Sequence, residues 1–83
     1  MSEKLDLLDP KTSAYKVLCH LAFTGKMLKP SEIASALGEN GSTVRARLTE
    51  LKKNGLIDQG SEGYISLISP YDLIMKIYKD LRN

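Results

Sequence analysis

Residues 40–57, NGSTVRARLTELKKNGLI, combine side chains that could bind an anion. The stretch holds four cations and two early hydroxyls against one acid, Glu50: the cations are Arg45, Arg47, Lys52 and Lys53, and the hydroxyls are Ser42 and Thr43. Guanidinium, ammonium and hydroxyl groups donate hydrogen bonds to phosphate oxygens and to the acceptor atoms of bases. A solvated helix can carry the same residues with no partner, so their place in the fold must decide between the two interpretations.

The positive charge is concentrated in the middle of the chain. The 83 residues have a net charge of only +2, but residues 11–53 hold eight Lys or Arg against three Glu, a net +5. The flanking segments 1–10 and 54–63 are acidic. A local basic surface of this kind is the usual electrostatic footprint of a polyanion partner.

Other kinds of chemistry find little support in the composition. The chain has a single cysteine, Cys19, and a single histidine, His20, which argues against an intramolecular disulfide and against a zinc centre. We find no nucleophile–base pair and no phosphate-cradling glycine loop, so we expect neither an enzyme nor a bound cofactor or metal. The N-terminus is polar, unlike a signal peptide, and no run approaches the roughly 20 apolar residues of a membrane span. We therefore expect a cytoplasmic protein with no membrane partner.

The first half of the chain predicts three helices within a single domain covering residues 1–83. Asp9 and Pro10 are suited to the N-cap and first position of a helix that ends at Thr24, before Gly25. Pro30 begins a short helix that ends at Gly38. Asn40 then caps a third helix, over about residues 41–54, with an apolar stripe formed by Val44, Leu48 and Leu51. Residues 1–9 form a short lead-in whose leucines could pack on the domain or on a partner.

The second half changes from helical to strand periodicity and back. Two short apolar segments flank the turn sequence Gly60-Ser61-Glu62-Gly63, which predicts a β-hairpin. Ser69 and Pro70 are suited to the N-cap and first position of a last helix, over residues 69–83. The predicted fold class is therefore mainly α with a small β-hairpin: a three-helix core, a two-stranded wing and an extra C-terminal helix.

The sequence GSTVRARLTELKKNGLI, followed by a glycine-bounded hairpin, resembles the winged helix-turn-helix domain of archaeal and bacterial transcription regulators, in the style of the MarR-like and ArsR-like groups. The resemblance covers residues 10–68. It implies sequence-specific binding of double-stranded DNA, with the third helix lying in the major groove.

The third helix places its polar residues where such a contact needs them. At about 100° per residue, the side opposite the apolar stripe carries Ser42, Ala46, Thr49 and Lys53. Arg45 is the best candidate for a base contact, because its planar fork matches the acceptors of guanine. The full set of expected DNA-binding residues is Ser42, Thr43, Arg45, Ala46, Arg47, Thr49, Lys52 and Lys53. Arg47 lies nearer the core and could instead pair with an acid.

The wing weakens the electrostatic case for DNA. In the resembling families the wing usually carries a basic residue, whereas the wing residues here are Ser61, Glu62 and Gly63. Glu62 at the tip would repel phosphate. We therefore expect a wing that makes only backbone contacts with DNA, or one that faces elsewhere.

The last helix has a wider apolar surface than a small core requires. It is expected to pair with a second copy through Leu73, Ile74, Ile77, Tyr78 and Leu81. The alternative is that this helix only covers the first helix of its own monomer. For the whole chain, the alternative function is a winged helix that binds another protein. RNA binding has less support, because there is little aromatic surface for stacking.

Overall fold

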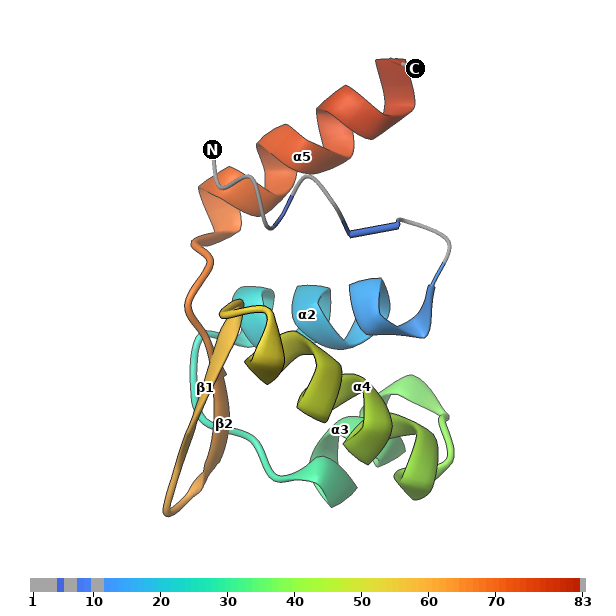
Figure 1. The fold of residues 1–83 in the computed structure, drawn as a ribbon, viewed down its shortest axis with the longest axis vertical. Coiled ribbons are helices and arrows are strands. Elements are labelled where there is room, and N and C mark those ends of the chain that lie inside the picture. Colours follow the sequence, from blue (N-terminus) through green and yellow to red (C-terminus); the bar gives the residue numbers. More distant parts are fainter. Residues whose placement is uncertain (1–4, 6–7, 10–11, 83) are drawn as a thin grey trace.

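Four helices and one hairpin follow each other in the predicted order within the part of the chain that the computed structural model describes, namely residue 5, residues 8–9 and residues 12–82. In order, they are α2 (Ser13–Thr24), α3 (Pro30–Leu37), α4 (Gly41–Lys53), β1 (Ile57–Gly60), β2 (Gly63–Ser66) and α5 (Pro70–Arg82). Figure 1 shows α2 in the middle, with α5 on one side of it and α3 and α4 on the other. The hairpin stands at one end of these layers, which is the arrangement of a winged helix-turn-helix.

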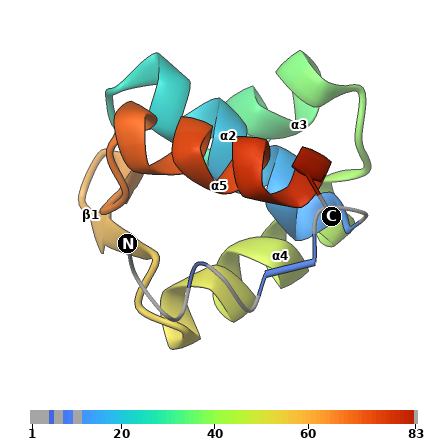
Figure 2. The same cartoon turned by 90° about the horizontal axis from the view of Figure 1, so that it is seen from above.

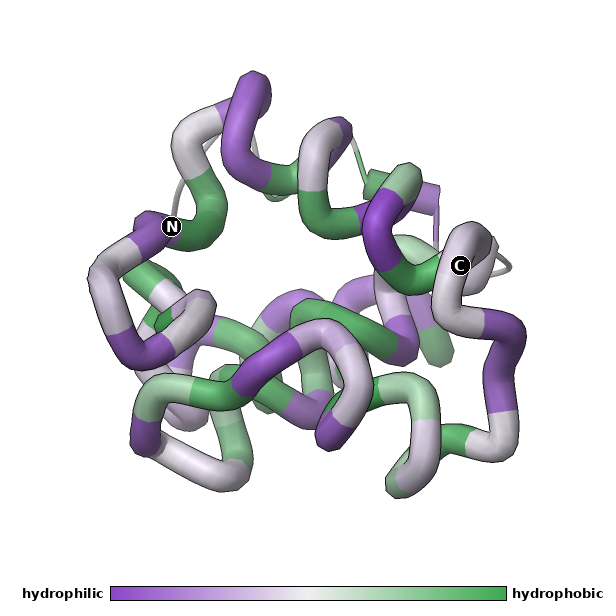
Figure 3. The backbone as a smooth tube through the Cα atoms, turned by 90° about the horizontal axis from the view of Figure 1, so that it is seen from below, coloured by the Kyte–Doolittle hydropathy of each residue, from purple (hydrophilic) through white to green (hydrophobic). Residues whose placement is uncertain are grey.

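The core is built around α2. Its residues Ala14, Val17, Leu18 and Leu21 are buried, and they meet the apolar stripe of α4 from one side. Seen from above in Figure 2, α5 runs across α2. Hydrophobic and hydrophilic stretches alternate along the helices (Figure 3), as expected for helices that each bury one face.

Two leucines of the N-terminal lead-in belong to the domain. Leu5 is fully buried in the core, and Leu8 is partly buried against it. The sequence alone left open whether the lead-in packs on the domain or on a partner. For these two residues the answer is the domain itself.

The helix α2 begins later than the sequence predicted. Thr12, not Asp9, is its N-cap, and the Thr12 amide and hydroxyl both donate to the Asp9 carbonyl, at 3.2 and 2.9 Å. This turn holds Thr12 in an extended conformation, so the helix can start only at Ser13. The prediction for Pro10 lies outside the described residues. The end of α2 is as predicted, with Gly25 in the left-handed conformation at φ 73°.

The hairpin is antiparallel, with Ile57 opposite Ser66 and Gly60 opposite Gly63. On its other side β2 forms an isolated bridge to the connection between α2 and α3, where Leu28 and Tyr64 exchange two N–H···O bonds of 2.8 Å. The sequence did not predict this bridge. It ties the hairpin to the helical core at a point more than 30 positions away in the chain.

Among the helices of the described residues, none is long and apolar enough to cross a membrane.

Candidate nucleic-acid and dimer interfaces

The turn between α3 and α4 is fixed by capping on both sides. Gly38 ends α3 in the left-handed conformation, at φ 64°. Asn40 caps α4, because its Oδ1 accepts hydrogen bonds from the Ser42 amide at 3.0 Å and from the Ser42 hydroxyl at 2.9 Å. The start of α4 is therefore rigid. The Ser42 hydroxyl already donates its hydrogen bond to Asn40, so it can only accept a further one.

The two faces of α4 are as the sequence predicted. Val44, Leu48 and Leu51 are fully buried. The opposite face is exposed along its whole length and carries the residues Ser42, Arg45, Ala46, Thr49, Lys52 and Lys53, with Thr43 half-buried at its edge. A helix with this division presents one polar, partly cationic side to any partner.

Two of the exposed residues have contacts that define how they can act. A Cβ at Gly41 would lie 3.7 Å from Nη1 of Arg45, so the Arg45 guanidinium lies beside the first turn of α4. Thr49 donates its hydroxyl hydrogen bond to the Arg45 carbonyl, at 3.0 Å. Thr49 thus has its methyl group and its acceptor lone pairs left for a partner.

The two lysines at the end of α4 differ. Lys52 donates from Nζ to Oε1 of Gln59 in β1, at 2.9 Å, and so links the helix to the hairpin. Lys53 is exposed beside it. The geometry favours Lys53 as a charge for an external anion, because Lys52 would have to share its ammonium group with the hairpin.

Arg47 is set apart from the other cations. It is half-buried, and its Nε is buried without a hydrogen-bond partner in the described part of the chain. The ion pairs that the structure gives for the described residues are Lys16–Glu39 and Lys76–Asp80, so the pairing with an acid considered for Arg47 is not among them. Of the four cations in α4, Arg47 is the one least open to a partner.

The tip of the hairpin is exposed and acidic. Ser61 and Glu62 form the two-residue loop between the paired Gly60 and Gly63, and both are exposed. Gly63 has a φ of 133°, and a Cβ at this position would collide with the Leu28 carbonyl. Gly63 is therefore required both for the turn and for the close approach of the hairpin to Leu28.

Two cations that the sequence interpretation missed lie in the connection between α2 and α3. Lys26 and Lys29 are both exposed and flank the segment that meets β2. In Figure 1 this connection runs between the hairpin and α3. No local motif marks either lysine. The signal that could have found them is the pairing of Leu28 with the hairpin, which no sequence pattern predicted.

The inner face of α5 belongs to the monomer. Leu73 is fully buried, and Ile77 packs against the core. Both residues were expected to pair with a second copy. They are turned toward their own domain instead, because α5 packs across α2 and covers the apolar surface of that helix.

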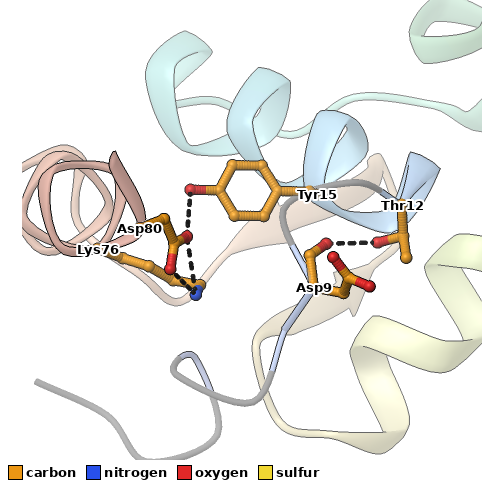
Figure 4. A network of polar contacts seen from close by, with 5 residues as sticks. All are labelled: Asp9, Thr12, Tyr15, Lys76 and Asp80. Atoms are coloured by element: carbon orange, nitrogen blue, oxygen red, sulfur yellow. Dashed lines mark hydrogen bonds and ion pairs between the residues drawn. The ribbon is translucent and has the colours of Figure 1, made fainter. Parts of the chain in front are cut away.

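A buried lysine completes this inner face (Figure 4). Lys76 is only 2% exposed, and its Nζ lies 3.1 Å from Oδ2 of Asp80 and 5.7 Å from the centre of the Tyr15 ring. Tyr15 donates a long hydrogen bond of 3.4 Å to the same carboxylate oxygen. Two causes raise the pKa of Tyr15 to about 12: the larger is its partial burial, and the smaller is the negative charge of the nearby Asp80 carboxylate. The three residues connect α5 to α2.

The outer face of α5 carries the large exposed side chains of this helix, and the Arg82 guanidinium lies over one of them, 5.6 Å from the centre of the Tyr78 ring. Ile74, Tyr78 and Leu81, all expected at the dimer surface, are exposed, and Tyr71 joins them. Tyr71, Ile74, Tyr78 and Leu81 are spaced by three, four and three positions, which is the spacing of a coiled-coil seam. An exposed apolar stripe of this kind is typical of a surface that binds another protein.

A pocket of about 270 Å³ lies between the end of α2 and the connection from β2 to α5. Its lining has no ionisable side chain, and the Ser66 hydroxyl in its wall is bonded to the amide and carbonyl of Ile68. This pocket therefore offers shape and mainly apolar surface, and its lining holds no ionisable side chain.

Comparison of the chain with protein-family models and with curated proteins finds no match.

Proposed function

We propose that the chain binds double-stranded DNA sequence-specifically and regulates transcription, with α4 in the major groove. The observation that carries the proposal is the exposed face of α4: small polar residues at its capped start and cations along its edge and end, on the second helix of a helix-turn-helix. The resemblance to the MarR-like and ArsR-like groups supports the same function. The proposed activity is binding and not catalysis. The proposed location is the cytoplasm.

Each residue of α4 takes the role that its environment allows. Arg45 contacts a base, because its fork matches the acceptors of guanine. Ala46 and the methyl group of Thr49 allow close approach and pack on thymine methyl groups. Lys53 contacts phosphate. Ser42 accepts a hydrogen bond from a base, and Thr43 lies at the edge of the contact. Arg47 is half-buried and contacts its own domain rather than DNA.

The protein is proposed to act as a homodimer through the outer face of α5. The exposed stripe Tyr71, Ile74, Tyr78 and Leu81 supports this, and Leu73 and Ile77 are left out because they pack in the monomer. The helix α5 lies on the far side of α2 from α4 (Figure 1), so a partner bound there leaves the DNA-binding face open. A second copy doubles the cationic surface, and this matters for a monomer whose net charge is only +2.

A second candidate is a winged helix that binds a protein partner. The exposed acidic hairpin tip, with Glu62, favours it, because a carboxylate at that place opposes phosphate and suits a basic protein surface.

Fluorescence-anisotropy titration of a mixed-sequence duplex at low and moderate salt separates the two functions. DNA binding predicts affinity that falls steeply as salt rises, since each phosphate contact releases counterions. An absence of binding even at low salt would reject the DNA proposal and favour the protein-binding one, with the hairpin tip and α5 as the surfaces to test.

A further inference from the structure

The hairpin lacks a cation of its own, but the connection between α2 and α3 that lies against it carries two exposed lysines, Lys26 and Lys29. Its exposed residues are Asp58, Gln59, Ser61 and Glu62. A wing without a positive charge has no side chain to hold a phosphate beside it. A cation that binds phosphate beside the hairpin must therefore come from a neighbouring element.

Three contacts place the connection between α2 and α3 directly against the hairpin. Leu28 exchanges two hydrogen bonds of 2.8 Å with Tyr64. A Cβ at Gly60 would collide with the Met27 side chain, and a Cβ at Gly63 would come within 3.0 Å of the Lys29 amide nitrogen. The backbone of Lys29 therefore lies at the side of the hairpin turn, one residue after the bridge.

Lys29 is held rigidly in this position. It is the N-cap of α3, in an extended conformation, and its carbonyl accepts the amides of Glu32 and Ile33 at 3.0 and 3.1 Å. Its own amide donates to Oε1 of Glu32 at 2.9 Å. All these bonds use backbone atoms of Lys29. The side chain is exposed, and it is outside both ion pairs given for the described residues.

We infer that Lys29 supplies the phosphate contact that the acidic hairpin lacks, binding a DNA phosphate between the hairpin and the start of α3. This inference rests on the proposed DNA binding. In Figure 1 the hairpin tip, the start of α3 and the start of α4 lie toward the same end of the molecule, away from α5. One duplex can therefore meet α4 and Lys29 together.

The proposed role of Lys29 depends only on its charge, so it can be tested by substitutions that leave the fold intact. Lys29→Met removes the ammonium group and keeps most of the apolar stem, whereas Lys29→Arg keeps the charge. Neither change touches the backbone bonds that cap α3. Lys79→Ala, on α5 at the opposite side of α2, removes one exposed cation away from the proposed contact and serves as the control.

The test is the slope of log K against log salt concentration for a mixed-sequence duplex, measured by anisotropy for the parent and the three variants. We expect Lys29→Met to weaken binding to all sequences and to reduce the slope by about 0.9 for each protomer on the duplex, the value for one phosphate contact on duplex DNA. We expect Lys29→Arg and Lys79→Ala to keep the parental slope.

The outcomes separate this inference from the function on which it rests. If the parent binds DNA and Lys53→Ala flattens the slope while Lys29→Met does not, the role of Lys29 is overturned and the function of α4 stands. If the parent shows no salt-dependent binding, the proposed function fails and the inference fails with it. Circular dichroism of Lys29→Met confirms that the comparison is made between folded proteins.

Discussion

The ammonium group of Lys76 lies 3.1 Å from the Asp80 carboxylate, one turn further along α5, and the lysine side chain is almost completely enclosed by the monomer. A buried charge of this kind is tolerated only with a partner, because desolvation of an unpaired ammonium group is costly. Tyr15 adds its ring and its hydroxyl to the pair from α2. The position of α5 on α2 thus depends on a polar contact as well as on Leu73.

Removal of the carboxylate is expected to destabilise the fold more than removal of the lysine. Asp80→Ala leaves the Lys76 ammonium group buried and unpaired, and we expect a loss of about 2 kcal/mol, less than the roughly 3–5 kcal/mol of a fully buried pair because Asp80 reaches solvent. Lys76→Met replaces the charge with a side chain of similar shape and should change stability by less than about 1 kcal/mol. Urea unfolding of both variants measures the difference. Equal losses would show that the ion pair does not govern this contact.

The stability of the protein should fall at high pH through Tyr15. Its pKa is raised from 10.0 to about 12 in the folded state, so the folded protein holds this proton more tightly than the unfolded chain does. The contribution is complete below pH 10 and is lost as the pH rises toward about 12. The stability difference between the parent and Tyr15→Phe should shrink across this range. A difference that stays constant with pH would contradict the raised pKa.

Base and phosphate contacts of α4 should respond differently to substitution. Arg45→Ala is expected to reduce discrimination between sequences by about 1–3 kcal/mol at the base it contacts. Lys53→Ala should weaken binding to all sequences similarly and reduce the salt slope by about 1 for each protomer on the duplex. Anisotropy titrations with specific and mixed-sequence duplexes measure both effects. If both variants bind as the parent does, α4 is not the recognition helix.

Ile74→Glu is expected to give a monomer without unfolding the domain. Ile74 is about half exposed on the outer face of α5, so a charge there opposes pairing and leaves the core intact. Ile77→Glu is the contrasting variant, because Ile77 packs against the core and its replacement should destabilise the monomer itself. Light scattering over a dilution series measures the mass. A parent that is monomeric at the highest concentration would end the dimer proposal.

Local signals were enough to predict most of the elements. The Asn40 cap, the glycines after α2 and α3, and the Ser69–Pro70 start of α5 act over a few residues, and each is found where the sequence predicted it. The buried face of α4 was also predictable, because its apolar residues form one narrow stripe on an otherwise polar helix. The predicted start of α2 was wrong because a turn from Asp9 to Thr12 competes with the helix.

The tertiary structure alone decided how α5 is oriented and which cation lies beside the hairpin. Apolar residues surround more than half of α5, so its sequence allowed several inward faces, and packing on α2 selected the one with Leu73, Lys76 and Ile77. Lys29 is brought to the hairpin by the bridge between Leu28 and Tyr64. Helix periodicity and capping depend on residues that are neighbours in the chain, so they can be predicted from the sequence. These two outcomes depend on contacts between residues far apart in the chain, which only the folded protein brings together.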